Sequence, residues 1–106
     1  MNRLYRYYLF LLLLLGVVPF FNSQTLINGK ITDEETGEDL IGASVKIVNS
    51  KYGTVSDFNG EFKLQTNIKP PFEIEVSYIG YDAKNLTVSN QKFIKVSLQS
   101  LDLELY

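Results

Sequence analysis

The chain has 106 residues, enough for one domain of ordinary size. It contains no histidine and no cysteine, which excludes histidine and cysteine nucleophiles, disulfides and the usual zinc sites. The formal net charge is −2, and arginine occurs only at positions 3 and 6. Nucleic-acid binding requires a basic surface that neutralises phosphates. We therefore expect no nucleic-acid partner. We also expect no cofactor, no metal and no catalytic residue.

The N-terminal residues have the pattern of an export signal. Arg3 and Arg6 precede an apolar stretch over residues 7–18, Pro19 ends that stretch, and the small residue Ser23 comes before Gln24. This order predicts a signal helix within a signal peptide over residues 1–23. The alternative is an anchor that is not cleaved, although a membrane-spanning helix needs about 20 apolar residues.

Removing residues 1–23 leaves eight lysines and twelve acidic residues, a net charge of −4. No polybasic segment that would bind anionic lipid remains. We therefore expect contact with a membrane only through the signal or anchor.

The rest of the chain alternates apolar and polar residues in short segments, which is typical of strands with one buried face. Residues 72–79 show the clearest alternation, and Pro70 and Pro71 end the preceding segment because proline cannot donate to a strand ladder. Such strands hide their apolar faces by packing two sheets together. We predict a seven-stranded Greek-key β-sandwich, immunoglobulin-like in outline, over residues 24–99 and a tail over residues 100–106. The expected strands are residues 26–32, 43–49, 54–56, 61–66, 72–79, 81–88 and 93–98.

The candidate site residues are structural and lie at turns. Residues 57–60 read Asp-Phe-Asn-Gly, a hairpin signal because Asn-Gly tolerates left-handed backbone conformations. Glycine supplies the same freedom at the other turns. The turn and motif residues that we single out are Gly37, Gly42, Gly53, Asp57, Asn59, Gly60, Tyr78, Gly80 and Tyr81.

Three acidic patterns invite a chemical interpretation. Glu73 and Glu75 share one strand face, which is better explained as a solvated surface than as an acid–base pair. Residues 57–61 begin like a calcium loop, but the glycine comes two positions too early and the closing glutamate is missing. The acidic run over residues 33–35 fits a solvated loop better than a calcium site.

Four aromatic residues could in principle form a sugar-stacking platform. Their positions beside turns and on an apolar strand face favour packing in the core and at its corners instead. They are Tyr52, Phe58, Tyr78 and Tyr81.

Four short patterns occur in a specific order. They are residues 27–33 (Ile-Asn-Gly-Lys-Ile-Thr-Asp), 36–45 (Thr-Gly-Glu-Asp-Leu-Ile-Gly-Ala-Ser-Val), 53–62 (Gly-Thr-Val-Ser-Asp-Phe-Asn-Gly-Glu-Phe) and 76–81 (Val-Ser-Tyr-Ile-Gly-Tyr). With these patterns the chain resembles the carboxypeptidase-regulatory-like domain, a transthyretin-like β-sandwich, as found at the N-terminus of SusC-type TonB-dependent outer-membrane receptors of Bacteroidota. The resemblance covers residues 26–98.

This resemblance implies a periplasmic accessory or interaction domain without catalytic residues, placed ahead of the plug and barrel of a nutrient receptor. Residues 98–104 resemble the run-in to the segment that engages TonB by strand addition. The implied partner is protein, either the plug and barrel of a longer chain or other envelope proteins. A free-standing exported module that binds protein or glycan is the alternative. An accessory domain of a secreted hydrolase is a third reading, disfavoured because the domain directly follows the signal.

Overall fold

The computed structural model describes residues 4, 7–8 and 24–101. The predicted signal helix falls mostly outside these residues, as does most of the predicted tail. Among the residues described, no helix is long and apolar enough to cross a membrane.

Residues 24–101 form an all-β domain with seven strands and no helical segment. The expectation of seven strands is confirmed. The strands are β1 (Thr25–Asp33), β2 (Ser44–Ile47), β3 (Gly53–Val55), β4 (Glu61–Thr66), β5 (Phe72–Ser77), β6 (Lys84–Val88) and β7 (Phe93–Leu98).

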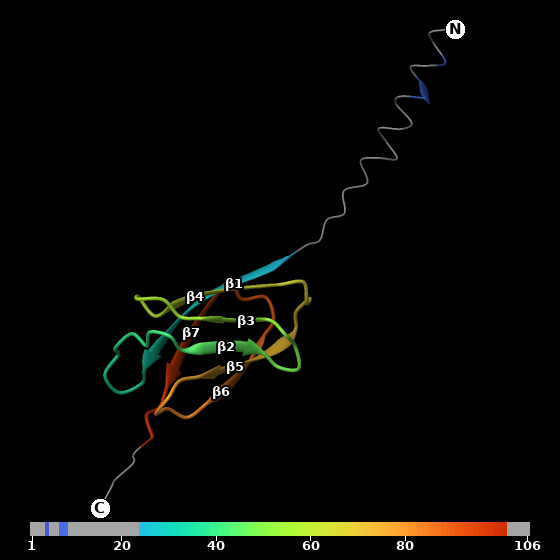
Figure 1. Ribbon diagram of the computed structural model, residues 1–106. Helices are drawn as coiled ribbons and strands as arrows, with labels where there is room; N and C mark the ends of the chain where they lie inside the picture. The colour runs from blue at the N-terminus through green and yellow to red at the C-terminus, as the bar shows by residue number, and fades with distance from the viewer. Residues whose placement is uncertain (1–3, 5–6, 9–23, 102–106) are drawn as a thin grey trace, which may run out of the picture.

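The strands make two sheets that pack into a sandwich (Figure 1). The first sheet has the order β4-β1-β7 and the second has the order β3-β2-β5-β6. Neighbouring strands are antiparallel except β1 and β7, the first and last strands, which pair in parallel. The start of β1 and the end of β7 therefore lie at opposite ends of the sandwich.

Alternation along each strand builds the core between the sheets. On β4 the buried residues are every second one, and the same holds for β5, because successive side chains of a strand point to opposite faces. Burying one such aliphatic or aromatic side chain stabilises the fold by about 1.5–3 kcal/mol. The buried apolar residues are Ile27, Ile31, Leu40, Ala43, Val45, Ile47, Phe62, Leu64, Phe72, Ile74, Val76, Val88, Val96 and Leu98.

Two strands are shorter than predicted, since β2 covers residues 44–47 and not 43–49, and β5 ends at Ser77 and not at residue 79. Two further details differ from the prediction. The strand expected over residues 81–88 begins only at Lys84, because Gly80 adopts φ 88° and Tyr81 leaves the sheet to form an isolated bridge with Ser100. The turn at residues 57–60 is present, but it does not make a hairpin. Strands β3 and β4 belong to different sheets, so this turn carries the chain from one layer of the sandwich to the other.

Each connection between consecutive strands lies at one of the two ends of the sandwich. We call the end where β1 starts the entry end, and it consists of residues 48–52, 67–71 and 89–92. The opposite end, where β7 finishes, is the exit end. It consists of residues 34–43, 56–60, 78–83 and 99–101.

Candidate functional site at the exit end

Eight of the nine turn and motif residues lie in the connections of the exit end. Gly53 differs, since it is the first residue of β3 and starts beside the entry end. The backbone of Gly53 is not left-handed, unlike the expectation for a turn glycine, and a Cβ there would lie only 3.1 Å from the Val45 carbonyl oxygen, so close packing favours glycine at this position. The eight others are Gly37, Gly42, Asp57, Asn59, Gly60, Tyr78, Gly80 and Tyr81. Of these, the four glycines have positive φ angles between 73° and 88°.

A hydrogen bond between Tyr81 and Asp33 closes the exit end. Asp33 is the last residue of β1 and continues the inward-facing series of that strand, so its carboxylate sits at the rim of the core and only 8% of the residue is exposed. The Tyr81 hydroxyl donates to Oδ2 of Asp33 at 2.5 Å. Oδ1 accepts from the backbone N–H groups of Glu35 (2.8 Å) and Thr36 (3.1 Å). The carboxylate thus ties the first loop of the domain to the turn after β5.

The same contacts move both pKa values away from neutrality. The hydrogen bond from Tyr81, followed by those from the backbone of Thr36 and Glu35, lowers the pKa of Asp33 below its ordinary value of 3.8. The hydrogen bond to Asp33, together with burial, raises the pKa of Tyr81 to about 12. Asp33 therefore stays ionised and Tyr81 stays protonated at neutral pH, which suits a structural contact and not proton transfer.

Asp57 and Gly60 shape the turn between β3 and β4. Oδ1 of Asp57 accepts from the backbone N–H groups of Asn59 and Glu61, both at 2.9 Å. Gly60 has φ 73°, and its carbonyl oxygen accepts from the Ile31 N–H at 2.8 Å. The hydrogen bond to Ile31 therefore holds this turn against β1 in the first sheet, directly before β4 begins.

Ser56 is a residue whose role the sequence did not reveal. It is buried, and its hydroxyl donates to the Leu40 carbonyl at 2.6 Å while accepting from the Ala43 N–H at 2.8 Å. Leu40 and Ala43 flank the motif glycine Gly42. A small residue that is both donor and acceptor is needed there, but a single serine between two turns carries no signal of burial.

Gly29 is a second such residue. It occupies an inward position on β1, and a Cβ there would overlap the Phe62 ring and the Ile94 carbonyl oxygen. Gly29 pairs with Phe62 across the β1–β4 ladder, so the missing side chain makes room for that ring. The glycine stands within the first of the four ordered patterns, although its packing partner could not be identified from the sequence.

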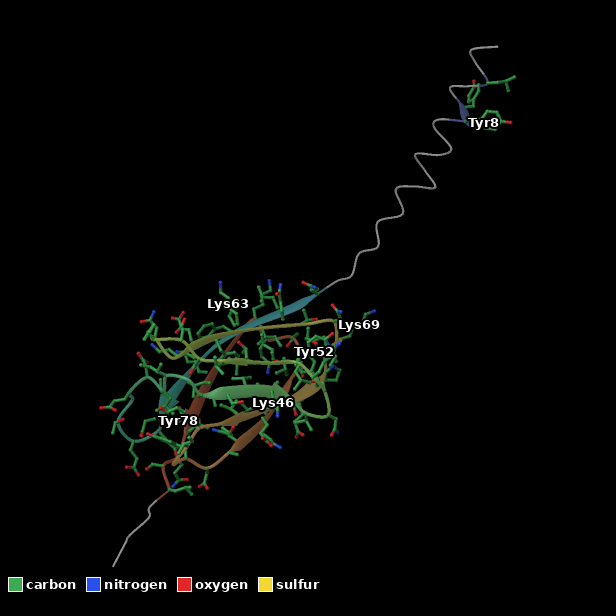
Figure 2. All side chains as sticks on the ribbon, viewed as in Figure 1. Tyr8, Lys46, Tyr52, Lys63, Lys69 and Tyr78 are labelled. Carbon is green, nitrogen blue, oxygen red and sulfur yellow. The ribbon has the colours of Figure 1, made fainter. Side chains whose placement is uncertain are left out.

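The remaining candidate groups do not converge on one site. Tyr52 and Tyr78 lie on opposite sides of the domain in Figure 2 and pack against the core from different ends, so they do not share a sugar platform. Tyr81 packs beside Tyr78, with ring centroids 5.5 Å apart, whereas Phe58 is 86% exposed and does not pack in the core. Figure 2 shows Lys46 and Lys63 on the outside of the strands.

The acidic patterns are also dispersed. Glu73 and Glu75 are exposed on the outer face of β5. Across the described part of the chain, no group of three or more acidic residues is arranged to hold a metal ion.

The comparisons with known proteins agree with this architecture. The model of the CarboxypepD_reg-like domain family matches residues 27–105, which include all seven strands except the first two residues of β1. The chain belongs to this family. The family resemblance of the four ordered patterns is thus confirmed.

Curated proteins that match this domain include TonB-dependent receptors. The chain is 37% identical over 84 residues to the TonB-dependent receptor SusC of Bacteroides thetaiotaomicron and 34% identical over 85 residues to the TonB-dependent receptor P39 of Formosa agariphila. Each match covers 76% of this chain but only 8% of the relative. The domain therefore corresponds to a small part of each receptor.

Solved structures share the fold. A chain in the crystal structure of a type II cohesin–X-dockerin complex from Acetivibrio cellulolyticus superposes with a TM-score of 0.61 at 16% identity, covering 76% of this chain and 61% of that one. A Bacteroides fragilis protein of unknown function gives a TM-score of 0.55 at 26% identity, covering 77% of this chain and 30% of that one. These similarities establish the sandwich architecture.

Proposed function

We propose that this chain is the non-catalytic N-terminal accessory domain of a TonB-dependent outer-membrane nutrient receptor. The observation that carries the proposal is the match of nearly the whole domain to SusC-type receptors that are roughly ten times as long. The domain then acts as an interaction module in the periplasm, and transport is the work of the plug and barrel of the longer protein. Its partners are proteins, first of all other parts of the same receptor.

Three observations support a role without catalysis. The sequence has neither histidine nor cysteine. The two groups whose pKa values are shifted, Asp33 and Tyr81, hold each other in the states that do not exchange protons near neutral pH. The hydrogen bonds of the exit end stabilise turns and leave no activated nucleophile.

The finer features of the chain form part of the same proposal. Residues 1–23 are a signal peptide that directs export, residues 24–99 are the sandwich, and residues 100–106 lead toward a TonB-engaging segment. The chain crosses between the sheets after β1, β3, β4 and β6, and we interpret this path as a Greek key.

Fractionation of the source cells tests the proposal directly. An antibody against residues 24–101 should detect, in the outer-membrane fraction, a polypeptide roughly ten times as long as this chain, because the relatives have that size. Detection of a product of about the size of this chain in the soluble periplasmic fraction, with no larger form, would reject the receptor assignment.

One observation favours the alternative, a free-standing exported module that binds protein or glycan. Ile79 and Phe58, both on the exit end, are 95% and 86% exposed, and exposed apolar side chains at loop tips are frequent in binding surfaces. Under this alternative, Ile79→Ser and Phe58→Ser abolish binding without loss of folding. Tyr81 is unsuitable for this test because its substitution breaks the contact with Asp33.

A further inference from the structure

The connections at the two ends of the sandwich differ in the sign of their charge. Each connection of the entry end contains one lysine and no acidic residue: Lys51 in residues 48–52, Lys69 in residues 67–71 and Lys92 in residues 89–92. The connections of the exit end contain no lysine. They carry the acidic residues Glu34, Glu35, Glu38, Asp39, Asp57 and Asp82.

The fold brings the three lysine-bearing connections together. Residues 67–71 follow the Thr25–Thr66 pair at the start of β1, and the Lys92 carbonyl oxygen accepts from the N–H of Asn28 on the same strand. Residues 48–52 lie beside the start of β5, where the Val48 N–H donates to the Glu73 carbonyl oxygen. Figure 2 shows Lys69 and Tyr52 on the side of the domain where β1 begins, away from Tyr78.

The lysines at the entry end are exposed, and Lys51 Nζ lies 5.9 Å from the centroid of the Tyr52 ring. Lys51, Lys69 and Lys92 are all in exposed residues, and the ion pair found in the described residues, Lys30 with Asp39 at 3.2 Å, lies elsewhere. Phe93, next to Lys92, is 50% exposed and adds an aromatic ring to this surface. Glu73 and Glu75, on the outer face of β5, are the acidic residues that reach furthest toward this end along the strands.

We propose that the entry end docks on an anionic membrane surface. The chain enters the domain at this end from the apolar stretch over residues 7–18, and only residues 19–24 separate that stretch from β1. Six residues span at most about 20 Å. Before the proposed removal of residues 1–23, while the apolar stretch lies in a membrane, the basic end of the sandwich is therefore held next to the lipid headgroups, where anionic lipid attracts each lysine.

The acidic end points away from such a membrane. The nine residues of β1 span about 30 Å, several times the screening length of about 8 Å at physiological salt. The repulsion of the exit end by anionic lipid is thus screened, and an acidic domain can bind an acidic surface through one end. The basic surface of the entry end could not be predicted from the sequence, because its lysines are about twenty residues apart. The proposal concerns the chain that still carries residues 1–23 and does not depend on the receptor assignment.

Vesicle flotation of the full chain tests the proposal, with vesicles of phosphatidylcholine alone or mixed with phosphatidylglycerol. The ratio of the two binding constants removes the hydrophobic contribution of residues 7–18, which both vesicles share, and the attraction of Arg3 and Arg6 to anionic lipid is common to the unmodified chain and every variant. We expect a ratio well above one at low salt that falls toward one at high salt. Neutralising one lysine should lower the ratio ~5-fold, and Lys51→Gln, Lys69→Gln and Lys92→Gln together should lower it about 100-fold.

Lys84→Gln is the matched control for Lys69→Gln, since it removes the same charge from the first residue of β6, which starts beside the exit end. It should leave the ratio within about two-fold of that of the unmodified chain, because this position lies beyond the screening length from the membrane. Circular dichroism melts of each variant verify folding. Equal effects of Lys84→Gln and Lys69→Gln would show that net charge alone acts, and would overturn the proposal. A ratio of one for the unmodified chain, with salt-dependent self-association in its place, would overturn it in favour of head-to-tail contact between copies.

Discussion

Tyr81 and Asp33, which are 48 positions apart in the sequence, meet through a 2.5 Å hydrogen bond that joins the last residue of β1 in one sheet to the turn after β5 in the other. The aromatic ring of Tyr78 packs against that of Tyr81. The turn Tyr-Ile-Gly-Tyr thus fastens the two sheets at the exit end, which explains why its tyrosines point inward while Ile79 between them is exposed.

This contact predicts the pH dependence of stability. The folded-state pKa of Asp33 lies below 3.8, so its contribution is present above pH 3.8 and is lost as the pH falls through the lower, folded value. The folded-state pKa of Tyr81 is about 12 against an ordinary 10.0, so its contribution is complete below pH 10 and is lost as the pH rises toward 12. Urea unfolding across this range should show both losses.

Tyr81→Phe should remove the alkaline loss and raise the pKa of Asp33 toward its ordinary value, because the largest cause of both shifts is gone. The ¹³C chemical shift of the Asp33 carboxyl group, followed by NMR during titration, measures this directly. Tyr78→Phe is the control and should leave the Asp33 titration in place. An unchanged Asp33 pKa in Tyr81→Phe would show that the hydrogen bond does not stabilise the carboxylate.

Ser56→Ala should destabilise the domain by about 1–3 kcal/mol. The substitution leaves the Leu40 carbonyl oxygen and the Ala43 N–H without their partner in a buried place. Ser89→Ala, in an exposed residue of the entry end, should change stability by less than about 0.5 kcal/mol. Chemical denaturation of both variants provides the comparison, and equal free energies of unfolding would contradict the importance of the buried hydroxyl.

Gly29→Ala should cost about 1–3 kcal/mol because the added methyl group overlaps the Phe62 ring in a filled core. The double variant Gly29→Ala/Phe62→Leu should be more stable than the sum of the two single changes predicts, since leucine removes the overlap with the ring while the overlap with the Ile94 carbonyl oxygen remains. A double-mutant cycle measures this coupling. Strict additivity would mean that the two residues do not compete for space.

Gly60→Ala and Gly37→Ala separate backbone strain from close packing. Both glycines have φ near 75°, a conformation that costs an L-residue about 1–2 kcal/mol. A Cβ on Gly37 meets nothing within 4 Å, whereas one on Gly60 lies 2.8 Å from the Ile31 carbonyl oxygen. We therefore expect Gly60→Ala to be the more damaging in thermal unfolding. Equal losses would imply that the backbone at Gly60 relaxes without cost.

The sequence predicted the features that depend on local pattern. Alternation located every strand, and the Asn-Gly step located the turn whose Gly60 has a left-handed backbone. What it could not predict depends on contacts between distant segments. The separation of β3 and β4 into different sheets, the parallel pairing of β1 with β7, and the bond from Tyr81 to Asp33 have no local signature. The end of β6 nearest Tyr81 was misplaced for this reason.

In the candidate site, too, the features that depend on local pattern were predictable and the contacts between distant segments were not. Glycines with positive φ follow from turn chemistry, whereas Ser56 and Gly29 act through neighbours in space. The basic entry end likewise arises from three separate loops that meet only in the folded domain.

We propose that this sandwich is an exported module on the periplasmic side of the outer membrane. N-terminal sequencing of the protein from its source cells, combined with protease digestion before and after the outer membrane is made permeable, tests this location. We expect a mature N-terminus at Gln24, and digestion of residues 24–101 only after permeabilisation. Retention of Met1 in a cytoplasmic protein, or digestion in intact cells, would contradict it.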